Sequence, residues 1–143
     1  MNQKGLTKAI VISVILVLIL ITGITGIVLY RYMTEEIPVN LYVSNQSTLH
    51  DPAKIRVIVD GTVRFNRICY SDDQHNWTEV EFNVSRGSHT IKTVEEYNGS
   101  QKEESFRLSG ELWIVVDFWS GNDPDTKTGR FTIGFHDQQV AFM

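Results

Sequence analysis

A single uncharged run near the N-terminus constrains this chain more than any other feature. Residues 9–30 contain no charged side chain and consist mostly of Ile, Val and Leu. As a helix this run would be about 33 Å long, against roughly 30 Å for the hydrocarbon core of a bilayer. It lacks the polar face that a soluble amphipathic helix shows. The sequence therefore predicts a transmembrane helix at 9–30.

The residues that flank this run predict its orientation. Basic side chains lie on both sides of it, and tyrosines stand where an aromatic belt would form. These residues are Lys4, Lys8, Tyr30, Arg31 and Tyr32. Two lysines and the terminal amine precede the run, whereas one arginine and then two glutamates follow it. The positive-inside rule thus places residues 1–8 in the cytoplasm, a short juxtamembrane linker at 31–37 and an extracytoplasmic domain at 38–143.

An uncleaved anchor is the favoured interpretation of the N-terminus, and two alternatives stay open. A cleaved secretory signal has a shorter apolar core and a small-x-small cleavage site, whereas residues 29–32 read Leu-Tyr-Arg-Tyr. The tetrapeptide at 4–7, Lys-Gly-Leu-Thr, is loosely similar to the leader of archaeal type IV pilins and archaellum components. That similarity implies a minor filament subunit cut after Gly5. An intact mass beginning at Leu6 would support it.

Charge is distributed unevenly along the chain. Residues 1–34 carry a net charge of +3 and residues 35–143 a net charge of −7. An acidic domain without clustered Lys or Arg argues against nucleic-acid binding, because neutralising phosphates needs such clusters. The only cysteine, Cys69, excludes a disulfide within the chain and any multi-cysteine zinc site. We expect no cofactor.

After Pro38 the apolar residues recur at every second position, which is typical of strands with one buried face and one wet face. In the first run, residues 39, 41 and 43 are expected inside, and Asn40, Tyr42 and Ser44 outside. Turn residues separate the runs and predict strands near 38–44, 54–60, 62–70, 78–84, 89–97, 103–108, 112–119, 130–136 and 139–143. This spacing predicts an all-β domain, an antiparallel immunoglobulin-like β-sandwich of eight or nine strands.

The run at 112–119 differs from the others because it is apolar on both faces. We expect it to be a central strand. Its Asp117 would then need a partner such as an arginine, since an unpaired carboxylate is costly to bury. The second apolar face of this strand is also a place where a protein partner could dock.

Two segments resemble the small extracytoplasmic β-domains called PEGA-like. The first is Val-Ile-Val-Asp-Gly at 57–61, and the second is Val-Ser-Arg-Gly-Ser-His-Thr-Ile at 84–91. PEGA-like domains show a strand that ends in Asp-Gly and, later, a Gly-x-His-Thr-Ile strand entry. The resemblance covers about residues 55–92 and lacks the motif that names the family. It implies an extracytoplasmic β-sandwich and no catalytic residues.

The long loops hold the candidate binding residues. In an antiparallel sandwich the loops after odd-numbered strands share one end, here 45–53, 71–77, 98–102 and 120–129, and we expect that end to be membrane-distal. Aromatic rings there could stack on the apolar faces of sugars. The aromatic candidates are Trp77, Tyr97 and Trp119. Asp123 and Asp125 have a spacing that Ca²⁺ can use, although a solvated acidic loop is the simpler interpretation.

Four Asn-x-Ser/Thr sequons predict N-glycosylation of an exposed surface. They begin at Asn45, Asn76, Asn83 and Asn98. The alternative is that Asn, Ser and Thr simply crowd turns together.

Catalytic motifs are missing from the sequence, which contains no Gly-x-Ser-x-Gly, no His-Glu-x-x-His and no Gly-rich phosphate loop. We therefore expect no enzymatic activity. The favoured function is a membrane-anchored interaction or accessory module in a cell-envelope assembly, with a protein partner in the envelope. The alternatives are a carbohydrate-binding surface module and a pilin-like minor filament subunit.

Overall fold

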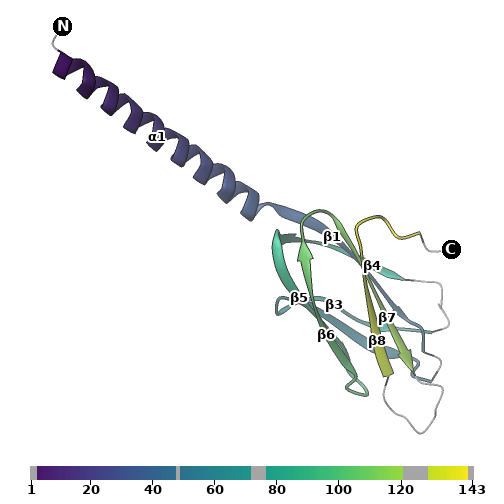
Figure 1. Ribbon diagram of the computed structural model, residues 1–143. Coiled ribbons are helices and arrows are strands. Elements are labelled where there is room, and N and C mark those ends of the chain that lie inside the picture. Colours follow the sequence, from purple (N-terminus) through teal and green to yellow (C-terminus); the bar gives the residue numbers. More distant parts are fainter. Residues whose placement is uncertain (1–2, 48, 72–76, 121–128, 142–143) are drawn as a thin grey trace. The chain divides into compact units, whose positions relative to one another are not determined.

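The chain forms one N-terminal apolar helix followed by two β-sheets (Figure 1). The computed structural model describes residues 3–47, 49–71, 77–120 and 129–141. It divides into two compact units, residues 1–35 and residues 36–143. The second unit is called the β domain below.

Helix α1 (Gln3–Thr34) is long and apolar enough, from Ile10 to Thr34, to cross a membrane. Its threonine hydroxyls donate to carbonyl oxygens one turn back, with Thr22 Oγ1 3.0 Å from Leu18 O. Such bonds satisfy the hydroxyl groups inside the helix itself. The helix continues to Thr34, and the first strand begins at Glu36.

Eight strands lie close to their predicted positions. They are β1 (Glu36–Asn45), β2 (Ala53–Val59), β3 (Thr62–Cys69), β4 (Thr78–Ser85), β5 (Gly87–Glu95), β6 (Gln101–Leu108), β7 (Leu112–Ser120) and β8 (Gly129–His136). One sheet has the order β4-β1-β7-β8 and the other β3-β2-β5-β6. The ninth expected strand is wrong as far as residues 139–141, which belong to no strand, and residues 142 and 143 lie outside the described chain.

The prediction of a wholly antiparallel arrangement is wrong at one pair. Strands β1 and β7 are neighbours and run parallel, with Val39 opposite Leu112 and Asn45 opposite Phe118. Within each sheet, odd-numbered strands run in one direction and even-numbered strands in the other. Two odd-numbered strands that become neighbours, such as β1 and β7, are therefore parallel. Contacts also join the loops that follow odd-numbered strands, since Asn45 Nδ2 donates to Cys69 O over 3.2 Å.

A single hydrophobic core lies between the sheets. Each strand contributes alternate side chains to it, as the period of two predicts. The buried members are Ile37, Val39, Leu41, Val43, Ala53, Ile55, Val57, Val59, Phe65, Cys69, Val84, Ile91, Phe106, Leu108, Ile114, Val116, Phe118 and Phe131. Gly129 is a close-packed position, because a Cβ atom there would collide with the ring of Phe118.

Strand β1 is buried on both faces, which corrects the expectation of a wet outer face. Asn40, Tyr42 and Ser44 point away from the core but are only 8%, 9% and 2% exposed. The strand is central, between β4 and β7, and large side chains of these neighbours lie beside its outward residues. Alternation therefore predicted the direction of these side chains correctly but not their burial.

Candidate binding face on one sheet

The outer side of the sheet β4-β1-β7-β8 concentrates aromatic and polar side chains. We call it the aromatic face and define it by the outward residues of the four strands. They are Glu36, Pro38, Asn40, Tyr42, Ser44, Glu79, Glu81, Asn83, Ser85, Trp113, Val115, Asp117, Trp119, Arg130, Thr132, Gly134 and His136, together with Trp77 just before β4. The register places Tyr42 between Glu79 and Val115, and Trp113 between Asn40 and His136. Aromatic rings thus lie on the two central strands, between the glutamates of β4 and the residues of β8.

Asp117 is the centre of a hydrogen-bond network on this face. Its Oδ1 accepts from Ser44 Oγ over 2.6 Å and from Trp77 Nε1 over 2.9 Å. Gln46 Nε2 in turn donates to Ser44 Oγ over 2.9 Å. The carboxylate is therefore held by a hydroxyl and an indole, instead of the arginine that we expected. Because Trp77 precedes β4, this bond fastens its indole over the aromatic face.

Further along β1, other outward side chains also pair with each other. Tyr42 donates its phenol hydrogen to Glu79 Oε1 over 3.0 Å, and Asn40 Nδ2 donates to Glu111 Oε1 over 3.2 Å. Burial, followed by the hydrogen bond and the charge of Glu79, raises the pKa of Tyr42 above its ordinary value. Tyr42 thus stays a neutral hydrogen-bond donor at physiological pH.

Trp119 is the most open ring of β7. It is 37% exposed, and its Nε1 donates to Thr132 Oγ1 of the neighbouring strand over 3.2 Å. This bond fixes the indole while leaving ring surface in solvent. The arrangement can offer apolar ring surface to a ligand, with Arg130 opposite it on β8.

The predicted three-ring platform is divided between the two sheets. Trp77 and Trp119 both belong to the aromatic face, on either side of Asp117. Tyr97 is 61% exposed but lies in the turn between β5 and β6, which belongs to the other sheet. The structure therefore associates two of the three predicted aromatic residues with one surface.

The predicted metal site, Asp123 and Asp125, lies outside the described residues. Among the residues that are described, no group of three or more His, Cys, Asp or Glu side chains is arranged to hold a metal ion.

The predicted glycosylation sites have different environments. Asn45 is 2% exposed, and its Nδ2 donates to both His50 O and Cys69 O. Its Oδ1 accepts from Ser47 N, so the side chain organises the loop after β1 and is unsuitable as a glycan carrier in this fold. Asn83 is exposed on β4, whereas the Nδ2 of Asn98 is buried. Asn76 lies outside the described residues.

Glu95 is a structural residue that sequence analysis missed. It is 1% exposed, and its carboxylate accepts hydrogen bonds from the backbone N–H groups of Lys54, Tyr97 and Asn98. These bonds close the turn between β5 and β6 and attach it to β2. The available signal was a glutamate at the inward-facing end of a strand just before Asn98-Gly99.

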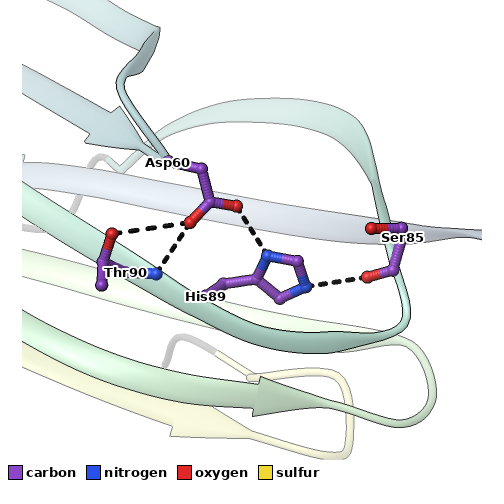
Figure 2. A network of polar contacts seen from close by, with 4 residues as sticks. All are labelled: Asp60, Ser85, His89 and Thr90. Carbon is purple, nitrogen blue, oxygen red and sulfur yellow. Dashed lines mark hydrogen bonds and ion pairs between the residues drawn. The ribbon is translucent and has the colours of Figure 1, made fainter.

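The two segments that resemble PEGA-like domains meet at one hairpin (Figure 2). Asp60 Oδ2 lies 2.6 Å from His89 Nδ1, and Asp60 Oδ1 accepts from Thr90 N over 2.9 Å. His89 Nε2 lies 2.8 Å from Ser85 O. Both ring nitrogens of His89 thus face oxygen atoms, one of a carboxylate and one of a backbone carbonyl. The motif thus fastens the Asp60-Gly61 turn to the start of β5.

Asp60 also has the backbone geometry that its turn requires. Its φ of 48° and the 77° of Gly61 are the left-handed values of a tight hairpin turn. Burial acts to raise the pKa of Asp60, but hydrogen bonds from Thr90 and His89 outweigh it and lower that pKa below its usual value. The carboxylate is therefore stabilised in its ionised form.

Cys69 lies in the core near the end of β3. Burial raises the pKa of its thiol to about 11, despite the opposing charge of Arg67. A thiol in this state is a weak nucleophile at neutral pH. Cys69 therefore has the properties of a small hydrophobic core residue.

No family model matches this chain, and neither does any curated protein or solved structure compared with it. The PEGA-like resemblance therefore stays a prediction, and the candidate site rests on its geometry alone.

Proposed function

We propose that this chain is a single-pass membrane protein whose extracytoplasmic β domain, an immunoglobulin-like sandwich, is an interaction module in a cell-envelope assembly. The aromatic face is its binding surface, and a protein is its partner. One observation carries this proposal: β7 places Trp113, Val115 and Trp119 on the outer side of its sheet. The outer side of an isolated sheet is normally polar, whereas the centre of a protein interface is rich in aromatic residues.

The proposed membrane location rests on α1. The span from Ile10 to Thr34 has the length and composition of a membrane-crossing helix. Lys4 and Lys8 precede this span, and the positive-inside rule then keeps the N-terminus in the cytoplasm. The β domain follows α1 directly, so it would lie outside the cytoplasm.

A non-enzymatic role is part of this proposal. Its support is the inert thiol of Cys69 and the engagement of His89 and Glu95 in holding turns. The polar groups of the aromatic face pair with one another around rings, which suits recognition better than proton transfer.

Site-specific photo-crosslinking in native membranes tests the proposal. A photoreactive amino acid in place of His136, which is exposed on the aromatic face, should yield discrete crosslinked products. The matched control places the same amino acid at Ser109, which is exposed in the turn between β6 and β7 and lies outside the aromatic face. Equal products at both positions, or no product at His136, would contradict the proposed binding surface.

Topology has a separate test. Ser109→Cys should react with a membrane-impermeant maleimide on intact cells, because the buried Cys69 contributes no background. Asn2→Cys should react only after the cells are permeabilised. The reverse pattern would contradict the proposed orientation.

A second candidate is carbohydrate binding, favoured by the position of Trp77 and Trp119 on either side of Asp117. Exposed indole surface beside a carboxylate is suited to stack on a sugar ring and accept a hydrogen bond from its hydroxyl groups. Trp119→Ala should then abolish binding in titrations with envelope polysaccharide. Unchanged sugar affinity in that variant would exclude this surface as the sugar site.

A further inference from the structure

The outer side of the second sheet, β3-β2-β5-β6, carries a net positive charge. We call it the basic face and define it by its outward residues. They include Lys54, Arg56, Ile58, Val63, Ile68, Lys92, Val94, Glu96, Glu103 and Arg107. Four cationic and two anionic side chains give it a net charge of +2. Glu96 is shared between Lys54, at 2.7 Å, and Arg56, at 3.3 Å.

Lys92 and Arg107 lie away from that ion-paired cluster, on β5 and β6. Lys92 is opposite Glu103, and Arg107 is opposite Ser88 and exposed. The basic face also carries exposed apolar side chains, since Val63 is 50% and Ile68 47% exposed. Both of these apolar residues lie on the edge strand β3, beside the charged residues of β2.

The aromatic face, by contrast, carries a net negative charge. Its carboxylates are those of Glu36, Glu79, Glu81 and Asp117, and its one guanidinium is that of Arg130, a net charge of −3 with His136 neutral. Each copy of the chain therefore carries an acidic, aromatic surface on one sheet and a basic, aliphatic surface on the other. Contact between two aromatic faces, or between two basic faces, would bring like charges together.

We infer that the protein partner is a second copy of this chain, with the aromatic face of one copy seated on the basic face of the next. This inference rests on the proposed function, because it assigns an occupant to the same binding surface. The contact is heterologous, so each copy keeps one face unused and further copies can add. The result is a row or a ring of copies rather than a closed two-fold dimer.

Such a contact is compatible with anchoring every copy in one membrane. Strand β1 follows α1 after a single residue, so each domain begins at its own helix. A heterologous contact can relate neighbouring domains by translation, or by rotation about an axis parallel to the membrane normal. The first strands then point the same way in all copies, and all helices enter the same bilayer.

Crosslinking with engineered cysteines tests this inference in the full-length protein in its native membrane. Asn83→Cys puts a thiol on the aromatic face and Ser105→Cys puts one on the basic face, both at exposed positions. With a flexible bismaleimide, the double variant should form a ladder of dimers, trimers and larger species. Either single variant should remain monomeric, and the parent protein with only Cys69 measures background.

Charge reversal gives the matched control. In the double-cysteine background, Glu81→Lys or Lys92→Glu alone should weaken the whole ladder, dimers included, because each change sets like charges against each other at every contact. Both changes together should restore the ladder, since the attraction is then only inverted. Thermal unfolding of all variants should match the parent, which separates loss of contact from loss of fold.

The outcomes distinguish this inference from the proposed function. A dimer formed by one single-cysteine variant, without larger species, means an isologous contact and overturns the inference. Crosslinks from position 83 to a different polypeptide also overturn it but leave the proposed binding surface intact. If the cysteine variants give no crosslinked product and the photoreactive residue at position 136 gives none either, both the inference and the proposed function are overturned.

Discussion

Hydrogen-bonded polar side chains serve two different purposes in two regions of the β domain. At the turns, Glu95, Asn45 and Asp60 bind backbone groups, so their partners belong to the fold itself. On the aromatic face, Asp117 and Glu79 bind other side chains instead. An unsatisfied backbone group has no alternative partner once it is buried, whereas a side chain on an outer face can turn toward water or a ligand. The first region should therefore dominate stability and the second should dominate binding.

Removal of the Glu95 carboxylate should have the largest effect on stability. Glu95→Ala leaves three backbone N–H groups without their acceptor, and we expect the free energy of unfolding to fall by about 3–5 kcal/mol. Thermal and denaturant unfolding of the full chain in detergent measures this loss. Glu96→Ala, one residue away, removes only solvent-screened ion pairs with Lys54 and Arg56 and should cost far less. Equal losses in the two variants would refute the structural role of Glu95.

Asn45 offers a second test, which also separates structure from modification. Asn45→Ala removes two donated hydrogen bonds to carbonyl oxygens and should lower the free energy of unfolding by about 2–3 kcal/mol. Asn83→Ala removes a sequon at an exposed position and should change stability by under about 0.5 kcal/mol. Intact mass spectrometry of both variants shows which one loses a glycan. A glycan on Asn45 would be incompatible with the fold described above.

Trp119→Ala tests whether the aromatic face contributes more to binding than to stability. The ring is 37% exposed and makes one hydrogen bond, to Thr132, so we expect a stability loss of about 2 kcal/mol, below that of Glu95→Ala. The same variant should abolish the crosslinked products at His136. A large stability loss would instead identify Trp119 as a core residue, and unchanged crosslinking would remove it from the binding surface.

The smallest expected effect is the pH dependence that Asp60 contributes. The pKa of Asp60 is lower in the folded protein than its usual value of 3.8, so its stabilisation is complete above that value. The stabilisation is lost as the pH falls below 3.8 and through the folded-state pKa. Asp60→Asn keeps a residue that tolerates positive φ, and it should flatten this part of the stability profile. If the stability of that variant falls in acid as steeply as that of the parent, the contacts of Asp60 with His89 and Thr90 do not stabilise the fold.

Local patterns in the sequence predicted the elements well. Eight strands lie within about three residues of their predicted bounds, because alternating apolar residues and Gly-containing turns report backbone geometry directly. The resemblance to PEGA-like domains also singled out Asp60 and His89, which prove to be in contact. Those residues are distant in sequence, and no local rule states how they meet.

The candidate site was predicted only in part, for a different reason. Trp77 and Trp119 were predicted to be ligand-stacking aromatics, but the partner of Asp117 was expected to be an arginine and is Ser44 together with Trp77. These partners come from β1 and from the segment before β4, and the parallel pairing of β1 with β7 brings them together. Sequence spacing contains no information about which strands become neighbours.

The sequence by itself determined that the chain has an apolar helix followed by a β-rich domain, because charge, hydropathy and period are local properties. Only the tertiary structure decided that β1 lies beside β7, that Asn45 is buried, and that the two outer faces differ in charge. Each of these depends on contacts between segments many residues apart. Their formation is governed by packing of the whole domain, which burial and hydrogen bonding select together.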